Sequence, residues 1–324
     1  MKQSRLPVRW SDDIDEVLDA DVVVALAYRT QAGGVVISGV SPIGLRDRDA
    51  GTVGFTTSLG FGRKLERIRR NPQVALAFHA REHGRSRRAD YVLVQGTVSE
   101  VLRPDEAFLR QEIGKRSERY LGPPRRGFFW DRWLRVYYRD RVLVTVEVER
   151  IVRWPRLDGG GEPEVIGSPL PEGGLRQSPP KQGTGPRIDS RRAERRLGAV
   201  PHRLLGLVQA DGLPMVVPIT VTAADGRGLT VRTAGPVLPA GGRRAGVLGH
   251  KFYERVAGLT SRQYTGWLTV DTEDSSTGIY APHTERSLVI PHSKTIALLL
   301  NGLAATIAYR AAQKAGRQRL LDRS

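Results

Sequence analysis

Hydrophobic residues in the first 155 positions alternate with polar ones or run in short continuous stretches, which is the pattern of β-strands. Residues 141–153 alternate most clearly, with valines at every second position from Val142 to Val148. Stretches of similar character cover 22–28, 35–40, 52–57, 74–79 and 91–101. Together these stretches predict six strands, which are enough to close a small barrel.

Helical periodicity interrupts these strands in two places. Residues 63–70 place Leu65 and Ile68 three positions apart, and this helix must end before Asn71-Pro72 because a residue that precedes proline disfavours the helical conformation. A second helix is predicted over 104–120, with a proline at its start. Residues 128–138 carry six aromatic side chains, and we expect a helix here that packs against the barrel.

A similar order of elements recurs after residue 197. Both parts contain a strand, a glycine turn, a strand, a strand that ends in threonine, a Gly-Arg-basic sequence that opens a helix, and a further strand. An internal duplication explains this order. In the second part, strands are predicted over 203–209, 214–221, 229–233 and 264–270 and from 278 onward, and a helical stretch over 242–250.

Apolar periodicity is lost between residues 156 and 197, where glycine and proline are frequent. We interpret this segment as a linker or surface strap that contains a short exposed helix at 191–196. The chain therefore divides into an N-terminal domain (1–155), the linker (156–197), a second domain (198–292) and a basic helical tail (293–324).

Composition narrows the chemistry. The 324 residues include no cysteine, which excludes disulfides, thiolate-bound metals and thiol nucleophiles. The formal net charge of +17 describes a surface that attracts phosphates and other anions. His79 and His83 lie four positions apart but not on a predicted helix, so no metal site is predicted. No serine lies in a nucleophile-elbow context, so hydrolase chemistry is not expected.

Two further classes of partner are not expected. The longest apolar stretch, 295–309, falls short of the roughly 20 residues that span a bilayer, and the first 19 residues lack the apolar segment of a secretion signal. We therefore expect a cytoplasmic protein without membrane association. Aromatic residues make up only 6% and gather in one segment, whereas nucleic-acid binding uses aromatic platforms on a basic face, so nucleic acid is not expected as a partner.

The strongest candidate for chemistry lies within residues 54–78. Three hydroxyl side chains end a strand, two glycines follow, and two cations open a helix. Glycines let the backbone approach an anion, hydroxyl and N–H groups donate hydrogen bonds, and a helix N-terminus with cations neutralises negative charge. This pattern predicts a phosphate-binding turn, although its spacing is not that of a P-loop. The residues are Thr56, Thr57, Ser58, Gly60, Gly62, Arg63 and Lys64.

The order of several motifs resembles the pyridoxamine 5′-phosphate oxidase-like split-barrel superfamily, which includes flavin- and deazaflavin-dependent oxidoreductases. The motifs are T-T-S after a strand, G-R-K-L, R-x-N-P-x-V-A-L-x-F, and Y-V-L-V-Q-G-T-V at 91–98. The resemblance covers residues 21–149 well and 201–270 more weakly. It implies a mainly β (α+β) fold in which two split β-barrels are fused in tandem, with few short helices.

The resemblance also implies a cofactor, FMN or alternatively the deazaflavin F420, bound where one barrel meets the other. The implied activity is hydride transfer to or from an unidentified small molecule, and no catalytic residue is assigned. A non-catalytic flavin- or haem-binding protein is the alternative from another class. The cofactor-binding positions implied are Thr56, Thr57, Ser58, Arg63 and Lys64, with strand 37–43 beside the flavin ring and Gln95 as a further position.

The chain also departs from the family pattern. It lacks the C-terminal Arg-x-His motif of the oxidase that makes pyridoxal phosphate, so that reaction is not expected. Most members are homodimers, and a tandem chain would form either a pseudo-dimer by itself or a homodimer. Arg243 and Arg244 would correspond to Arg63 and Lys64, but Thr233 is followed by Ala-Gly-Pro, so the second half lacks the hydroxyl cluster.

Overall fold

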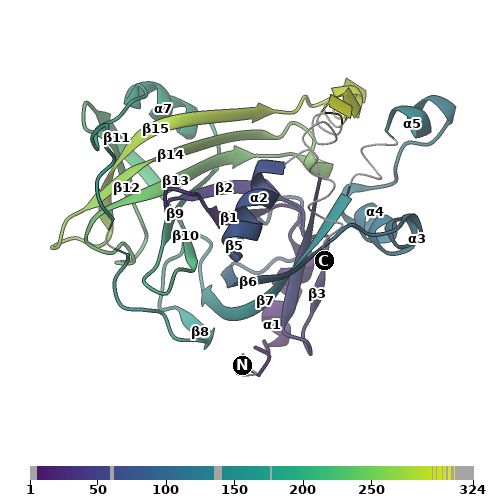
Figure 1. The fold of residues 1–324 in the computed structure, drawn as a ribbon, viewed down its shortest axis with the longest axis horizontal. Coiled ribbons are helices and arrows are strands. Elements are labelled where there is room, and N and C mark those ends of the chain that lie inside the picture. Colours follow the sequence, from purple (N-terminus) through teal and green to yellow (C-terminus); the bar gives the residue numbers. More distant parts are fainter. Residues whose placement is uncertain are drawn as a thin grey trace.

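The protein contains two antiparallel sheets that meet at a shared hydrophobic core (Figure 1). The computed structural model describes residues 6–58, 62–134, 141–175 and 177–293, and residues 295, 296, 298–300, 302, 303, 306, 307 and 310 near the C-terminus. The mainly β architecture with few short helices is confirmed.

The first sheet has eight strands from the N-terminal half and the linker. Its order is β2-β1-β5-β6-β7-β4-β3, and β8 pairs with β7. All six strands predicted from the hydrophobic pattern are present. The strands are β1 (Val24–Arg29), β2 (Val35–Val40), β3 (Arg46–Asp47), β4 (Thr52–Ser58), β5 (Gln73–Phe78), β6 (Tyr91–Leu102), β7 (Arg141–Trp154) and β8 (Glu164–Gly167).

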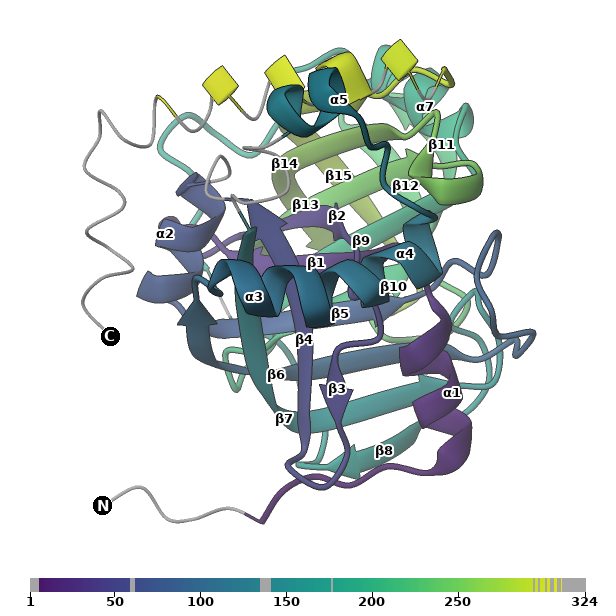
Figure 2. The same ribbon diagram turned by 90° about the vertical axis from the view of Figure 1, so that its right-hand side faces the viewer.

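Helices of the first half cover parts of this sheet. Both predicted helices are present, and the longer one is continuous through a π-helical segment and lies across the sheet (Figure 2). The sequence analysis missed α1, whose apolar residues lie on one buried side. The helices are α1 (Asp12–Ala20), α2 (Gly62–Arg70), α3 (Glu106–Phe108), η2 (Leu109–Gly114), α4 (Lys115–Leu121) and α5 (Phe128–Trp133).

The second sheet has seven strands in the order β10-β9-β13-β14-β15-β12-β11. This is the order of the first sheet with each strand replaced by its counterpart, so the sheet topology supports the duplication inferred from the sequence. The elements are α7 (Ser190–Gly198), β9 (His202–Val208), β10 (Pro214–Pro218), β11 (Thr220–Asp225), β12 (Gly228–Arg232), β13 (Gly241–Lys251), η3 (Glu254–Val256), β14 (Thr260–Val270) and β15 (Thr277–Val289).

The strand register makes the two halves equivalent residue by residue. In the first half Ala27 pairs with Ile37 and with Ala75. In the second half Gly206 pairs with Val216 and with Gly246, across a hairpin of the same length. Counting four residues on from Ala75 and from Gly246 gives His79 and His250, which are therefore equivalent positions about a pseudo-two-fold axis.

The halves are joined through β2 and β10, each of which packs on the other half's sheet. Glycines allow this approach. A Cβ atom at Gly206 would lie 2.9 Å from Ile37 Cδ1, and one at Gly246 would collide with the carbonyl of Val35. One hydrophobic cluster consequently includes side chains from both halves, among them Tyr91 and Leu248.

Two sequence-based expectations for the second half were wrong. Residues 242–250 are not helical but form most of β13, because this glycine-rich stretch is paired along its length with β14 and, from Gly246, with β9. Arg243 and Arg244 are therefore strand residues and do not open a helix as Arg63 and Lys64 do. The single strand expected over 214–221 is divided at Ile219 into β10 and β11.

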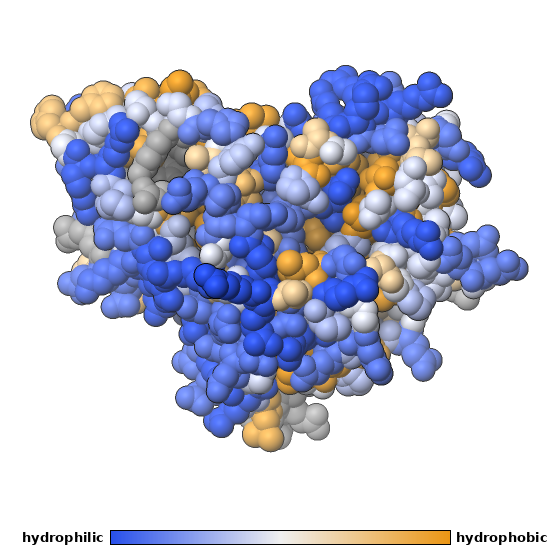
Figure 3. Space-filling view, turned by 180° about the vertical axis from the view of Figure 1, so that it is seen from behind, coloured by the Kyte–Doolittle hydropathy of each residue, from blue (hydrophilic) through white to orange (hydrophobic). Residues whose placement is uncertain are grey.

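The aromatic segment was also predicted incorrectly. Helix α5 forms, but none of its residues is buried, and Phe128 is 90% exposed. Hydrophobic side chains accordingly gather at the corner that α5 occupies, seen at the upper left in Figure 3. Tyr137 and Tyr138 lie outside the described residues.

The linker packs against both halves of the molecule. The linker contributes β8 to the first sheet, Leu170 and Leu175 to the core, and α7, which contains the predicted helix 191–196. Those residues that the structure describes between 295 and 310 are helical. In the described part of the chain, no helix is long and apolar enough to cross a membrane.

Candidate functional site

A cavity of about 1730 Å³ lies between the two halves. Its walls come from β2, β4, α2 and the α3–α4 helix of the first half, and from β14, β15 and the linker. Cofactor and drug-sized ligands occupy roughly 300–1,000 Å³. The cavity therefore has room for a cofactor together with a second small molecule.

The β4–α2 wall carries five of the six residues predicted to bind a cofactor. Thr57 and Lys64 are buried, Thr56 and Ser58 are half-buried, and Arg63 is exposed at the start of α2. The strand brings the hydroxyl groups to the cavity and the helix brings the cations. Residues 59–61, which include the predicted Gly60, lie outside the described residues.

Lys64 is the best-defined charge at this wall. Its Nζ lies 3.4 Å from Thr57 Oγ1, so ammonium and hydroxyl face the same space. Burial lowers the pKa of Lys64 to about 8, because removal from water disfavours the charged form. An anion bound beside Lys64 would favour the charged form and raise this pKa again. The wall is consequently suited to a phosphate group.

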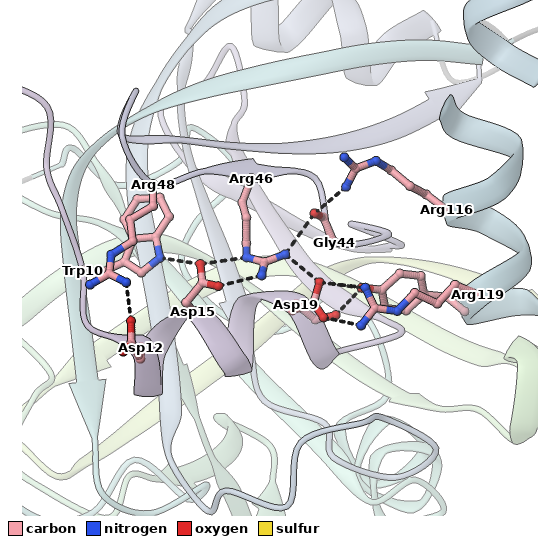
Figure 4. Close-up of polar contacts among 10 residues, drawn as sticks. Trp10, Asp12, Asp15, Asp19, Gly44, Arg46, Arg48, Arg116 and Arg119 are labelled. Carbon is pink, nitrogen blue, oxygen red and sulfur yellow. Dashed lines mark hydrogen bonds and ion pairs between the residues drawn. The ribbon is translucent and has the colours of Figure 1, made fainter. Parts of the chain in front are cut away.

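An ion-pair network fixes the helix that forms another wall (Figure 4). Arg46 reaches Asp15 and Asp19 of α1, each at 2.6 Å, and Arg119 of α4 reaches the same Asp19 at 2.5 Å. Hydrogen bonds from Arg46 hold the pKa of Asp15 below its usual range. Arg116 of α4 donates to the Gly44 carbonyl. The network holds α4 at a set distance from α1 and so shapes the cavity.

The second half and the linker supply a further set of cations. Arg187, Arg244 and Arg286 line the cavity. Gln177 of the linker ties this side to the first half, because its Nε2 donates to the Gly33 carbonyl and its Oε1 accepts from the backbone N–H of Arg244, both at 2.9 Å. The linker thus forms part of the rim of the cavity.

Gln95 is placed apart from the other five predicted residues. It is fully buried between the halves and is not among the residues that line the cavity. Its amide nitrogen donates to Gln209 and to the Pro214 carbonyl, and its amide oxygen accepts from Arg150. Arg150 in turn pairs with Asp211. The structure thus brings five of the six predicted residues together and places the sixth in an interface network.

The structure also assembles a histidine cluster that the sequence analysis did not foresee. His79 and His250 meet across the pseudo-two-fold axis with their Nε2 atoms 2.6 Å apart, and His202 packs against both rings. His202 also pairs with Glu82 at 2.6 Å. His83 lies apart, against Phe252. Within the described residues, no group of three or more potential metal ligands is arranged to hold an ion.

Comparison with known proteins gives matches only among solved structures. No family model and no curated protein matches the chain. A conserved hypothetical protein from Mycobacterium tuberculosis is 20% identical with a TM-score of 0.34, covering 50% of this chain and 95% of its own. An F420 reductase is 18% identical with a TM-score of 0.31, covering 42% and 94%. A pyridoxamine 5′-phosphate oxidase-related, FMN-binding protein from Nostoc punctiforme is 8% identical with a TM-score of 0.28, covering 61% and 87%.

Two features of this chain identify its fold. The strand order is repeated in the two sheets, and the T-T-S and R-K motifs lie on β4 and α2 of the first copy. The fold is the tandem split barrel that the sequence led us to expect. In this tandem split barrel the cavity lies where the two barrels meet, and it is built from residues of both. The sequence motifs indicated the β4–α2 wall. They carried no signal for β14 and β15, because these strands reach the cavity only through the packing of the two halves.

Proposed function

We propose that the tandem split barrel binds FMN in the cavity between its halves and supports hydride transfer to or from a small organic molecule. The observation that carries the proposal is the group of hydroxyls and cations on β4 and α2, which lines a cavity large enough for flavin and substrate. When bound, the flavin would supply the redox chemistry, and the protein would supply binding, orientation and electrostatics.

The residues present fit the phosphate of FMN. Thr57 and Lys64 are within hydrogen-bond distance of each other and face one space, and Arg63 lies one residue earlier on the same first turn of α2. Charge-assisted hydrogen bonds to phosphate oxygens are stronger than neutral ones. A bound phosphate would also offset the cost of keeping the Lys64 ammonium away from water.

The rest of the cavity fits an aromatic ring system. Residues of β2 line it on one side, among them Val36, Ser38 and Val40, and Ile43 follows. The opposite side comes from β14 and β15 of the second half. We therefore propose that the second half serves this site as a partner subunit serves a dimeric split barrel.

F420 is a second candidate, and one observation favours it. The cavity is lined by more cations than a single phosphate requires, because Arg125, Arg126 and Lys181 add to the three arginines that come from the linker and the second half. Such a surface suits a cofactor that carries additional negative charge. A non-catalytic flavin- or haem-binding role is the remaining alternative.

The test is a titration of the purified chain with FMN, F420 and riboflavin, followed by flavin fluorescence. For Arg63→Ala combined with Lys64→Ala, we expect FMN affinity to fall by at least about 100-fold, since two charge-assisted contacts are lost. Riboflavin, which has no phosphate, should bind this variant and the unaltered chain equally. Arg69→Ala combined with Arg70→Ala removes the same charge from the exposed end of α2 and is the matched control.

Three results would decide against the proposal. Equal loss in the control would mean that net charge, not the β4–α2 wall, attracts FMN. Saturable binding of F420 without FMN would select the alternative cofactor. Binding of haem, or of flavin that no reductant reduces in the bound state, would select a non-catalytic role.

A further inference from the structure

The histidine pair at the pseudo-two-fold axis has a defined proton arrangement. His79 Nδ1 lies 2.9 Å from the Ala77 carbonyl oxygen, and a carbonyl only accepts, so Nδ1 carries the hydrogen. In a neutral ring the other nitrogen of His79 is then an acceptor. His250 Nε2, 2.6 Å away, must therefore be the donor of this pair. It follows that Nδ1 of neutral His250 is an acceptor without a hydrogen.

Burial supports the neutral form of both rings. Burial lowers the pKa of His79 to about 3 and the pKa of His250 well below its usual range. His202 also disfavours positive charge on both rings, and His79 disfavours it on His250. The acceptor character of His250 Nδ1 is thus maintained across the ordinary pH range.

His250 Nδ1 has no hydrogen-bond partner within the described residues, and neither has Ser261 Oγ. Both atoms are buried, and both residues line the cavity. They are also direct neighbours, because His250 of β13 pairs with Ser261 of β14. Buried polar groups are nearly always hydrogen-bonded in folded proteins, so two adjacent unpaired atoms at a cavity wall indicate a missing partner.

The part of the cavity wall that belongs to the hydrophobic cluster around Ile43 is apolar. Val23, Ile43 and Leu259 line the same cavity and belong to one hydrophobic cluster. Most cations that line the cavity come from other elements, namely α2, the loop after α4, the linker and the strands β7 and β15, and Arg244 lies six residues before His250 on β13. A charged ligand group would be poorly solvated beside this cluster, whereas a neutral group that both donates and accepts would satisfy both polar atoms.

We infer that His250 Nδ1 and Ser261 Oγ form a substrate subsite for a neutral, largely apolar molecule that carries a hydroxyl group. The ligand hydroxyl would donate to His250 Nδ1 and accept from the hydroxyl of Ser261. The inference deepens the proposed function, because the same cavity would hold the flavin, and it identifies the chemical class of the substrate. His250 would be a binding and orienting residue, held in its acceptor form by His79.

Phenol is a suitable probe, and anisole, in which a methyl group replaces the donated hydrogen, is its matched control. Calorimetric titration of the chain without added flavin should give saturable binding of phenol and at least about 10-fold weaker binding of anisole, because one hydrogen bond is missing. His250→Phe should weaken phenol about 10-fold and Ser261→Ala about 3-fold, with anisole unchanged. Ser117→Ala, at another wall of the cavity, should leave phenol binding unchanged.

A second measurement covers the possibility that His250→Phe fails to fold. Nitrogen-15 spectra of the histidine side chains should include an unprotonated Nδ1 signal that shifts with phenol and not with anisole. Equal binding of phenol and anisole, no saturable phenol binding, or an unaltered Nδ1 signal would each overturn the subsite. Because no flavin is added, failure here leaves the FMN titration unaffected, and failure of the FMN titration leaves this result standing.

Discussion

The strands on the two sides of the pseudo-two-fold axis pair in the same register, but one side lines the cavity and the other side is filled by side chains. Ser261 and Leu288 are paired at the cavity, whereas the equivalent pair on the other side is Tyr91 and Trp154. Those two aromatic rings are fully buried, 5.2 Å apart, and the Tyr91 hydroxyl donates to the Val216 carbonyl. One side of the duplicated interface is therefore open for a ligand, and the equivalent position on the other side is filled by two aromatic side chains.

The segments that follow β4 and β12 occupy equivalent positions in the two halves, and they also differ in whether their polar groups face the cavity. After β4, hydroxyls and cations line the cavity. After β12, the hydroxyl of Thr233 donates to the Gly235 carbonyl at 2.7 Å, and Arg243 bonds to the carbonyls of Pro239 and Ala240. The hydroxyl of Thr233 and Nη2 of Arg243 are thus engaged by carbonyl groups of this loop. The two halves share the strand order, whereas the loop after β12 lines a separate, smaller pocket of about 720 Å³.

The largest expected effect is a difference in the free energy of unfolding between substitutions at equivalent positions on the two sides. Trp154→Ala removes a ring from the packed side and should reduce the free energy of unfolding by about 3–5 kcal/mol. Leu288→Ala changes the equivalent position on the open side, where the side chain is 49% exposed, and should cost less than about 1 kcal/mol. Urea unfolding of both variants measures the difference. Similar losses would mean that the two sides are packed alike.

The sequence was sufficient for most of the first half. Period-two alternation and the turn residues predicted all six of its long strands, and the Asn-Pro pair correctly ended α2. The T-T-S and R-K residues indicated one wall of the cavity, because a local segment carries all of them. These features depend on neighbours in the chain, and local patterns describe such neighbours well.

Features set by long-range packing were not predictable in this way. Residues 242–250 were predicted as helical, whereas Gly246 is needed where the β13 backbone meets Val35. His79 and His250 are 171 positions apart, and only the register of two sheets brings them together. Gln95 was assigned to the cofactor by its motif, although in this chain it faces the packed side of the interface.

The next largest expected effect is the loss of stability on substitution of Gln95. Gln95→Leu would leave the buried Nε of Arg150 and the amide of Gln209 without their partner, so unfolding should become easier by about 1–3 kcal/mol. If the cofactor occupies the open side, FMN affinity should change by less than about 2-fold, since no contact is removed. Thermal unfolding and FMN titration of the same variant supply both values. A selective loss of FMN affinity would instead support the role predicted for Gln95 from its motif.

The smallest effect concerns Lys64, the buried cation in the first turn of α2. Its folded-state pKa is about 8, below the value of 10.5 for an exposed lysine. Between these values the unfolded chain binds a proton that the folded chain does not, so stability rises with pH across this window. The burial cost is fully present below pH 8 and is relieved as the pH approaches 10.5.

Lys64→Met removes this dependence. The stability of the unaltered chain relative to Lys64→Met should increase by about 1–2 kcal/mol from pH 8 to pH 10.5, measured by urea unfolding in low salt. Saturating FMN should flatten this increase, because a bound phosphate raises the pKa of Lys64 toward that of an exposed lysine. A pH dependence that is identical in both chains would show that Lys64 is hydrated in solution, and one that persists with FMN bound would place the phosphate away from Lys64.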